Sequence, residues 1–188
     1  MTATGSELAT IFLAFSRKKL LDQYWPRLKA CVEPMSVEQI WWRPNEASNS
    51  IGNLILHLNG NVTQWLVASF TRNEDKRDRP AEFSATGGLT AAELLVRLGA
   101  TLAEAGKVLD RLTVDELLAP YEIQGYHVHG LDAVYQVVEH FGLHYGQIAY
   151  IAKTISAKDL GFYRDLTSTG RASESNSHPK LVRFLHRI

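Results

Sequence analysis

Apolar residues recur every three to four positions through four long stretches of the chain, which is the period of a helix that buries one face. These stretches are residues 6–32, 50–71, 90–112 and 131–156. The apolar positions of the second are Ile51, Leu54, Ile55, Leu58, Val62, Trp65 and Leu66. The pattern predicts an all-α protein, an antiparallel four-helix bundle.

Local signals predict where several helices begin. A Ser or Thr followed three residues later by Glu or Gln forms a capping box, and the chain contains Ser36–Gln39, Thr90–Glu93 and Thr113–Glu116. The second and third of these open the helix at 90–112 and a short one that stops at Pro120. Pro26 predicts a kink, or a second helix that begins there, because proline fits the first turn of a helix and disrupts its interior.

The connections differ in character. Residues 73–88 are charged and contain Pro and Gly, so we expect a connecting loop. Residues 121–129 alternate and contain Gln124-Gly125, which indicates a short extended segment or hairpin. Residues 164–178 are rich in Ser, Thr, Gly and Asn. We therefore expect one folded domain over 1–166 and a flexible tail over 167–188, with a short helix at its end as one alternative.

Composition narrows the class of protein. The chain has 188 residues, 45% of them hydrophobic and 21% charged, and is long enough to bury its own core. Twenty basic residues balance twenty acidic ones, which argues against general affinity for nucleic acid. The one cysteine, Cys31, cannot form an intrachain disulfide, and we interpret it as a small buried hydrophobe. With neither a secretory signal nor an apolar run of membrane-spanning length, we expect a cytoplasmic protein with no membrane partner.

The last long helix contains a pair of histidines suited to a metal ion. His140 and His144 are four residues apart, so on a helix they lie within about 40° of each other and one turn apart. Both share a sector with apolar residues, so we expect them to face the core, where an unpaired imidazole is costly. A cation is a suitable common partner, since neutral imidazole binds zinc, nickel or iron.

A third ligand is expected from a facing helix, because three protein ligands hold a metal well and leave one position open. His57 is the one histidine of the second long helix and lies at the border of its apolar face. The sequence therefore predicts one divalent metal bound by His57, His140 and His144. Polar residues on the same faces are candidates for hydrogen bonds to these ligands or for substrate contacts: Asn61, Gln64, Gln136 and Gln147.

Alternatives to this site remain open. The buried histidines could instead be satisfied by amides such as those of Gln136 and Gln147, in a helical bundle without metal. His127 and His129 would lie on one side of an extended segment and could also bind metal, but they lack a third ligand. They could equally be solvent-exposed residues or lie at the rim of a pocket. His178 and His186 are assigned no role, and no general base is identified.

Two blocks of the chain resemble the DinB-like superfamily, over about residues 8–156. The first is Trp41-Trp42-Arg43-Pro44-Asn45, then Ser50-Ile51-Gly52-Asn53-Leu54, His57 and Gln64-Trp65; the second runs from Val137 through His140 and His144 to Gly146-Gln147-Ile148. The resemblance implies a four-helix bundle, often dimeric, whose metal is held by one histidine of the second helix and an HxxxH pair of the last. His57, His140 and His144 match those positions, and water completes the sphere in such sites.

The resemblance also suggests chemistry. Characterised relatives include metal-dependent transferases that use low-molecular-weight thiols and a thiol-dependent isomerase, while many members have no known activity. We expect a thiol transferase or a hydrolase whose metal activates a thiol or water for a small-molecule substrate. Nickel or zinc is the first expectation, with iron or manganese next. The alternative is a non-catalytic binding or stress-response module that the metal stabilises.

Overall fold

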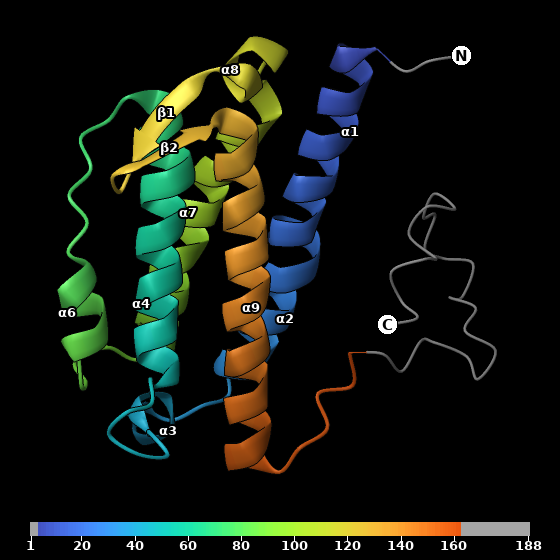
Figure 1. The fold of residues 1–188 in the computed structure, drawn as a ribbon. Coiled ribbons are helices and arrows are strands. Elements are labelled where there is room, and N and C mark those ends of the chain that lie inside the picture. Colours follow the sequence, from blue (N-terminus) through green and yellow to red (C-terminus); the bar gives the residue numbers. More distant parts are fainter. Residues whose placement is uncertain (1–3, 163–188) are drawn as a thin grey trace. The chain divides into compact units, whose positions relative to one another are not determined.

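The computed structural model describes residues 4–162, and this part of the chain is helical with one small sheet (Figure 1). Its first helical segment consists of α1 (Gly5–Arg17), a π-helical turn η1 (Lys18–Tyr24) and α2 (Trp25–Val32). Pro26 lies in the first turn of α2, the part of a helix that accommodates proline best. Of the two alternatives predicted from sequence, a kink or a second helix, the structure has a second helix that continues directly from η1.

The second helical segment carries the first histidine. The Ser50 hydroxyl accepts a hydrogen bond from the Asn53 N–H at 3.1 Å and so caps α4 (Ile51–Val62). The segment continues through the π-helical turn η2 (Thr63–Ala68) into α5 (Ser69–Thr71). It ends at Arg72, whose φ of 57° is left-handed.

The three capping boxes predicted from sequence all form. They begin α3 (Val37–Trp41), α7 (Ala91–Arg111) and α8 (Val114–Leu118). The last long helix, α9, extends over Gly130–Ser156. Since each box satisfies backbone N–H groups that the first turn leaves unpaired, these starts depend on local sequence alone.

The segment expected to be extended is a β-hairpin. Strand β1 (Pro120–Ile123) pairs antiparallel with β2 (Tyr126–His129), with Tyr121 opposite Val128. Gln124 and Gly125 both have positive φ, 54° and 78°, as a two-residue hairpin turn requires. The Trp65 indole N–H donates to Gln124 Oε1 at 3.0 Å, which ties the hairpin to the second helical segment.

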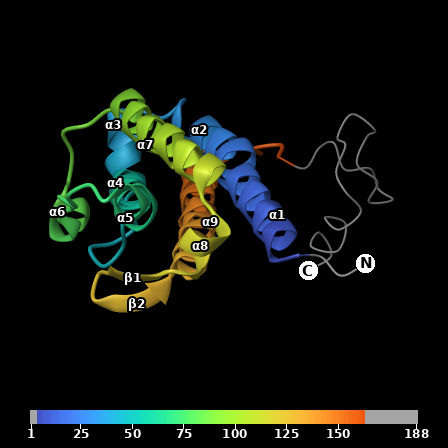
Figure 2. The same ribbon diagram turned by 90° about the horizontal axis from the view of Figure 1, so that it is seen from above.

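The long helices pack around a shared core. Helix α4 contacts α7 and α9, α2 also contacts α9, and α1 contacts α7 (Figures 1 and 2). In Figure 1, α4 and α9 lie side by side and run in opposite directions. The largest fully buried side chains come from all four segments and include Leu20, Leu28, Leu58, Leu66, Leu94, Leu98, Leu102, Phe141 and Ile148. Cys31 is buried as well, as predicted.

The connection at 73–88 differs from the simple loop that was expected. It contains a short helix, α6 (Arg79–Ser84), which packs on α4 (Figure 2). The prediction was wrong for these residues because Pro80 and the charged residues around it suggest a loop, whereas Asp78 caps a helix by accepting from the Ala81 N–H at 3.0 Å.

The described residues up to Lys158 form one compact unit, and a second unit begins at Asp159. The domain boundary expected at 166 and the tail at 167–188, including His178 and His186, lie outside the described residues. Among the helices of residues 4–162, none has the length and apolar character needed to cross a membrane.

Candidate metal centre

Three imidazole rings converge where α4 and α9 face each other. His140 Nε2 lies 3.1 Å from His57 Nε2 and 3.1 Å from His144 Nε2. One ligand atom from each of the three residues lies within 4.8 Å of the others. Imidazole nitrogens at about 2.0–2.1 Å from a tetrahedral zinc ion are separated by about 3.3 Å. The spacing therefore fits a bound divalent ion, and in residues 4–162 no other His, Cys, Asp or Glu group has such geometry.

In two of the rings, the hydrogen-bond partner of Nδ1 indicates the tautomer and hence which nitrogen offers its lone pair to the centre. His57 Nδ1 lies 2.8 Å from Glu82 Oε2, and His144 Nδ1 lies 2.7 Å from Gln147 Oε1. A carboxylate or amide oxygen only accepts, so Nδ1 carries the hydrogen and the Nε2 lone pair is directed inward. Metal-binding histidines typically donate their other N–H in this way.

Burial keeps the histidines of α9 neutral. Burial is the main reason that the pKa of His140 is lowered to about 3, and positive charge on the other two histidines, Arg77 and Arg79 contributes to the same lowering. Burial also lowers the pKa of His144, although the hydrogen bond with Gln147 acts in the opposite direction. Neutral imidazole is the form that binds metal, so both rings are ready to do so at neutral pH.

Glu82 of α6 is held by Arg77 as well as by His57. Arg77 Nε donates to Glu82 Oε1 at 2.7 Å and Arg77 Nη2 donates to Oε2 at 2.9 Å. The two side chains are 3% and 9% exposed. Burial by itself would raise the pKa of Glu82, but hydrogen bonds from Arg77 and His57 bring it below its usual value, so the carboxylate is ionised. Arg77 Nη2 also lies 3.1 Å from His57 Nδ1, but since both atoms carry hydrogen this is only a close contact.

Side chains at the connection between α3 and α4 hold α6 in position through hydrogen bonds. Arg43 Nη2 donates to Asn53 Oδ1 and to the Ala85 carbonyl, both at 2.9 Å. Asn53 Nδ2 donates to the Glu82 and Ala85 carbonyls at 2.9 and 2.8 Å. The Trp41 indole N–H donates to the Leu89 carbonyl at 2.8 Å. These bonds hold the segment that carries Arg77 and Glu82 against α4.

Two glycines of α4 permit this close packing. A Cβ on Gly52 would lie 2.8 Å from the Trp41 ring. A Cβ on Gly60 would lie 2.7 Å from Arg77 Nε and closer still to Glu82 Oε1. Both contacts are shorter than packed atoms tolerate, so the absence of a side chain lets the Trp41 ring and the Arg77–Glu82 pair reach the helix.

The polar candidates named from sequence take different positions. Gln147 bonds His144, as described, and Gln64 Oε1 accepts from Arg77 Nη1 at 2.9 Å, so Gln64 supports the site through Arg77. Asn61 Oδ1 and Gln136 Oε1 are buried without a hydrogen-bond partner, as is His140 Nδ1. An unpaired buried polar atom costs roughly 1–3 kcal/mol. Of the two amides that the metal-free alternative invokes, Gln147 thus bonds a histidine and Gln136 does not.

The competing pair lies elsewhere in the fold. His127 and His129 are exposed on β2, and no described residue joins them as a third ligand. The His129 backbone N–H donates to Asp132 Oδ2 at 2.9 Å, as part of the N-terminal cap of α9. His129 thus contributes to a helix start.

Sequence reasoning missed Glu82 and Arg77. Both lie in the charged connection at 73–88, where their charge is typical of a solvated loop. A possible signal was the Asp78-Arg79-Pro80 helix start, which places Glu82 in the first turn of a helix. Nothing in the local pattern indicates that this turn is buried.

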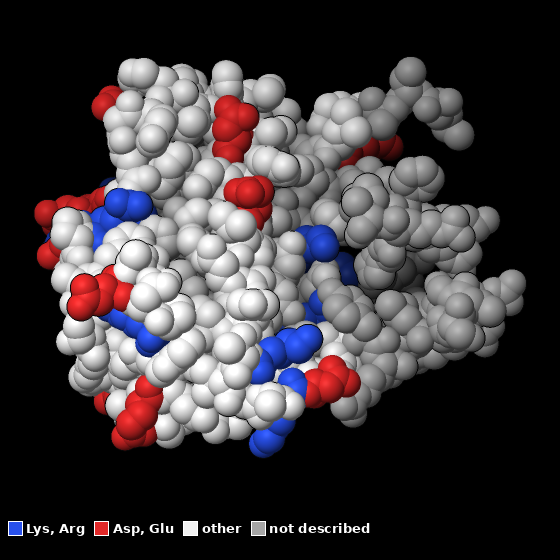
Figure 3. All heavy atoms as spheres, turned by 60° about the horizontal axis from the view of Figure 1, so that its bottom comes forward, with Lys and Arg blue, Asp and Glu red and all other residues white. Residues whose placement is uncertain are grey.

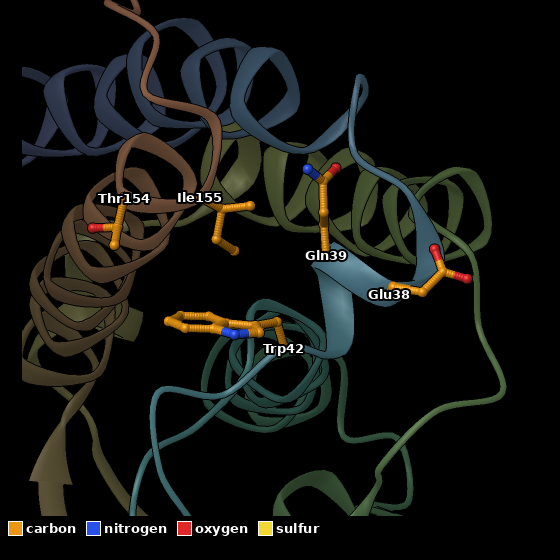
Figure 4. A pocket seen from close by; sticks show the side chains of 5 residues that line it. All are labelled: Glu38, Gln39, Trp42, Thr154 and Ile155. Carbon is orange, nitrogen blue, oxygen red and sulfur yellow. The ribbon is translucent and has the colours of Figure 1, made fainter.

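A surface pocket of 340 Å³ lies apart from the histidines, between α3 and the end of α9 (Figure 4). It is lined by Glu38, Gln39, Trp42, Thr154 and Ile155. The Trp42 side chain, 41% exposed, extends across it toward Ile155 (Figure 4). Of the two adjacent tryptophans, Trp41 thus packs inward on Gly52 and Trp42 lies at the surface.

Comparisons with known proteins give a family and a fold. A family model described as "Protein of unknown function (DUF1572)" matches residues 7–167. The crystal structure of a conserved protein from Enterococcus faecalis is similar, with a TM-score of 0.64 and 17% identity, over 77% of this chain and 97% of that one. At this identity the likeness concerns the fold alone. No curated protein matches.

Proposed function

The chain belongs to the DUF1572 family of proteins of unknown function, and we propose that it is a metal-dependent enzyme of the DinB-like type. The observation that supports this most is the convergence of three Nε2 atoms while the outer nitrogens of His57 and His144 are held by Glu82 and Gln147. Three imidazoles would leave a coordination position for a ligand.

We further propose that the fold is the antiparallel four-helix bundle of that superfamily. The four long helical segments, with α4 and α9 adjacent and opposed in direction, support this proposal (Figure 1). So do the places of His57 in the second segment and of the HxxxH pair in the last. A homodimer, which the resemblance also implies, stays a prediction.

The residues of the site fall into two groups, those that would bind the ion and those that orient the ligands. His57, His140 and His144 would hold the ion, and imidazole favours zinc, nickel or iron over manganese, which prefers oxygen ligands. Glu82 and Gln147 orient two of these rings. A divalent ion bound there would act as a Lewis acid and lower the pKa of a bound water or thiol. The reaction class that fits is transfer of a low-molecular-weight thiol to a small electrophile, or hydrolysis.

The metal content of the purified protein tests the site. We expect one divalent ion per chain by plasma mass spectrometry, and its loss in the His140→Ala/His144→Ala double variant. The matched control is His127→Ala/His129→Ala, which removes two histidines from the exposed strand and should retain the ion. Equal metal content in both double variants would refute a site at these three histidines.

Turnover is tested on the metal-loaded protein. Glutathione or cysteine with 1-chloro-2,4-dinitrobenzene probes thiol transfer, and p-nitrophenyl acetate probes hydrolysis. We expect a rate that the His140→Ala/His144→Ala variant lacks. Stoichiometric metal without turnover across a broad set of thiols and electrophiles would favour the non-catalytic, metal-stabilised module.

A further inference from the structure

Unpartnered buried polar atoms are concentrated beside the candidate metal centre. Among the side chains of residues 4–162, the buried polar atoms without a hydrogen bond are Arg17 Nε, Asn61 Oδ1, Gln136 Oε1 and His140 Nδ1. Arg17 Nε has an ion-pair partner, Asp110, at 2.8 Å. The remaining three atoms all belong to α4 and α9, the helices that carry the histidines.

Helix geometry places the two amides opposite each other. The Nε2 atoms of His57 and His140 face each other at 3.1 Å between helices that run in opposite directions (Figure 1). Asn61 follows His57 by four residues, and Gln136 precedes His140 by four. Each amide is therefore displaced by about 6 Å along its helix, in the same direction, toward the hairpin end.

The exposure of the two residues suits a binding site for a small molecule. Asn61 is 3% exposed, so the protein shields its amide from bulk water. Gln136 and the two histidines of α9 are only partly buried, so the centre is accessible from their side. Buried oxygen atoms without donors favour a ligand that brings an N–H group.

From this geometry we infer that Asn61 and Gln136 form a subsite for an amine or amide N–H of the small molecule whose thiolate or other anionic atom binds the metal. The inference rests on the proposed function. The ligand class is a short molecule whose nitrogen lies a few bonds from its metal-binding atom, because the amides are one helical turn from the histidines.

Binding of two simple thiols to the cobalt-substituted protein tests the subsite. Cysteamine carries an amine two carbons from its sulfur, and ethanethiol carries none. The dissociation constants are measured by titration of the cobalt visible spectrum at one pH. The ratio of the two constants is then compared among variants, so that the different acidity of the thiols cancels.

We expect Asn61→Leu and Gln136→Met each to reduce the preference for cysteamine by roughly tenfold, as loss of a hydrogen bond to a charged group predicts. The constant for ethanethiol should change by less than about twofold. Asn59→Leu is the matched control, since Asn59 Oδ1 accepts from the Thr101 hydroxyl at 2.8 Å and belongs to the contact with α7. Circular dichroism confirms folding, and Gln136→Met keeps side-chain length should Asn61→Leu fail to fold.

An unchanged ratio in both variants would overturn the inference. So would equal weakening of both thiols, which would mean that the amides only orient the histidines or hold water. Failure of the wild-type protein to bind cobalt would instead refute the metal centre itself. The cobalt titration that precedes the thiols separates these two failures.

Discussion

At the scale of single residues, Glu82 decides how His57 is presented. Its carboxylate accepts from His57 Nδ1 at 2.8 Å, and Arg77 donates to both of its oxygens. The Arg77–Glu82 pair is buried, so removing one charge leaves the other without compensation. The ion pair therefore stabilises one orientation and one tautomer of His57, a candidate metal ligand.

We expect Glu82→Gln to weaken metal binding by about 10–100-fold, the usual effect of losing a group that orients a ligand. The amide keeps the shape of the side chain but loses the charge that balances Arg77. A competition titration against a chelator measures the affinity. Glu104→Gln, which removes only the surface pair with Lys107, is the control. Equal affinities in the two variants would contradict a positioning role for Glu82.

The pKa of His140 predicts how acid affects the metal-free protein. Folded His140 titrates at about 3, whereas the unfolded chain takes up that proton near the ordinary value of 6.5. Between these values the unfolded state binds more protons, so the free energy of unfolding falls as the pH falls. Urea unfolding of the chelator-treated protein at pH 7.5 and 5.0 should show this loss, and it should be smaller in His140→Leu. The same loss in both proteins would exclude His140 as its source.

At the scale of elements, the placement of α6 on α4 makes the site possible. Arg43 and Asn53 hold the backbone of residues 82–85, and Gly60 leaves room for the Arg77–Glu82 pair. Arg43 and Asn53, together with Trp41, thus have a structural role. They attach to α4 the segment that supports His57.

Gly60→Ala tests this contact against a matched substitution in another helix. Alanine stabilises a helix interior by about 0.5–1 kcal/mol relative to glycine, and this is the expected result for Gly146→Ala, where a Cβ meets open space. At Gly60 the Cβ would collide with the buried ion pair, so we expect a loss of roughly 1–3 kcal/mol and weaker metal binding. Urea unfolding and chelator competition measure the two effects. Similar stabilisation at both positions would show that the Arg77–Glu82 pair and α6 can shift to accommodate the added Cβ at little cost.

At the scale of the whole molecule, a metal ion would join helices far apart in sequence. His57 and His140 are 83 positions apart, and they contribute from two of the long helical segments. An ion that binds only the folded chain stabilises it by mass action. The surface charge is not concentrated in one patch on the face shown in Figure 3. There, basic (blue) and acidic (red) side chains are interspersed around a largely uncharged area.

Removal of the metal should lower the midpoint of thermal unfolding. At free metal about 100 times the dissociation constant the ion contributes about 2.7 kcal/mol, which corresponds to roughly 5–10 °C for a chain of this size. Differential scanning fluorimetry with and without chelator measures the shift. His127→Ala/His129→Ala should show the full shift, and His140→Ala/His144→Ala should show none. A shift in the latter variant would place the stabilising ion elsewhere.

The sequence by itself determined what depends on neighbours along the chain. Helical periodicity located the long helices, and capping boxes located three helix starts to the residue. Gln124-Gly125 located the hairpin turn. The spacing of His140 and His144 predicted their proximity, because a helix brings residues four apart to one face in any context.

Only the tertiary structure decided what depends on packing between segments. It brought His57 within 3.1 Å of His140 and placed Glu82 and Arg77 behind His57. The sequence could suggest the contact between His57 and His140, because a lone histidine at the border of a helix's apolar face suggests a partner. It could not suggest the contact of Glu82 with His57. The charged residues of the connection at 73–88 predict a solvent-exposed loop. Whether the Glu82 carboxylate is buried depends on the packing of α6 against α4 and on the space that Gly60 leaves.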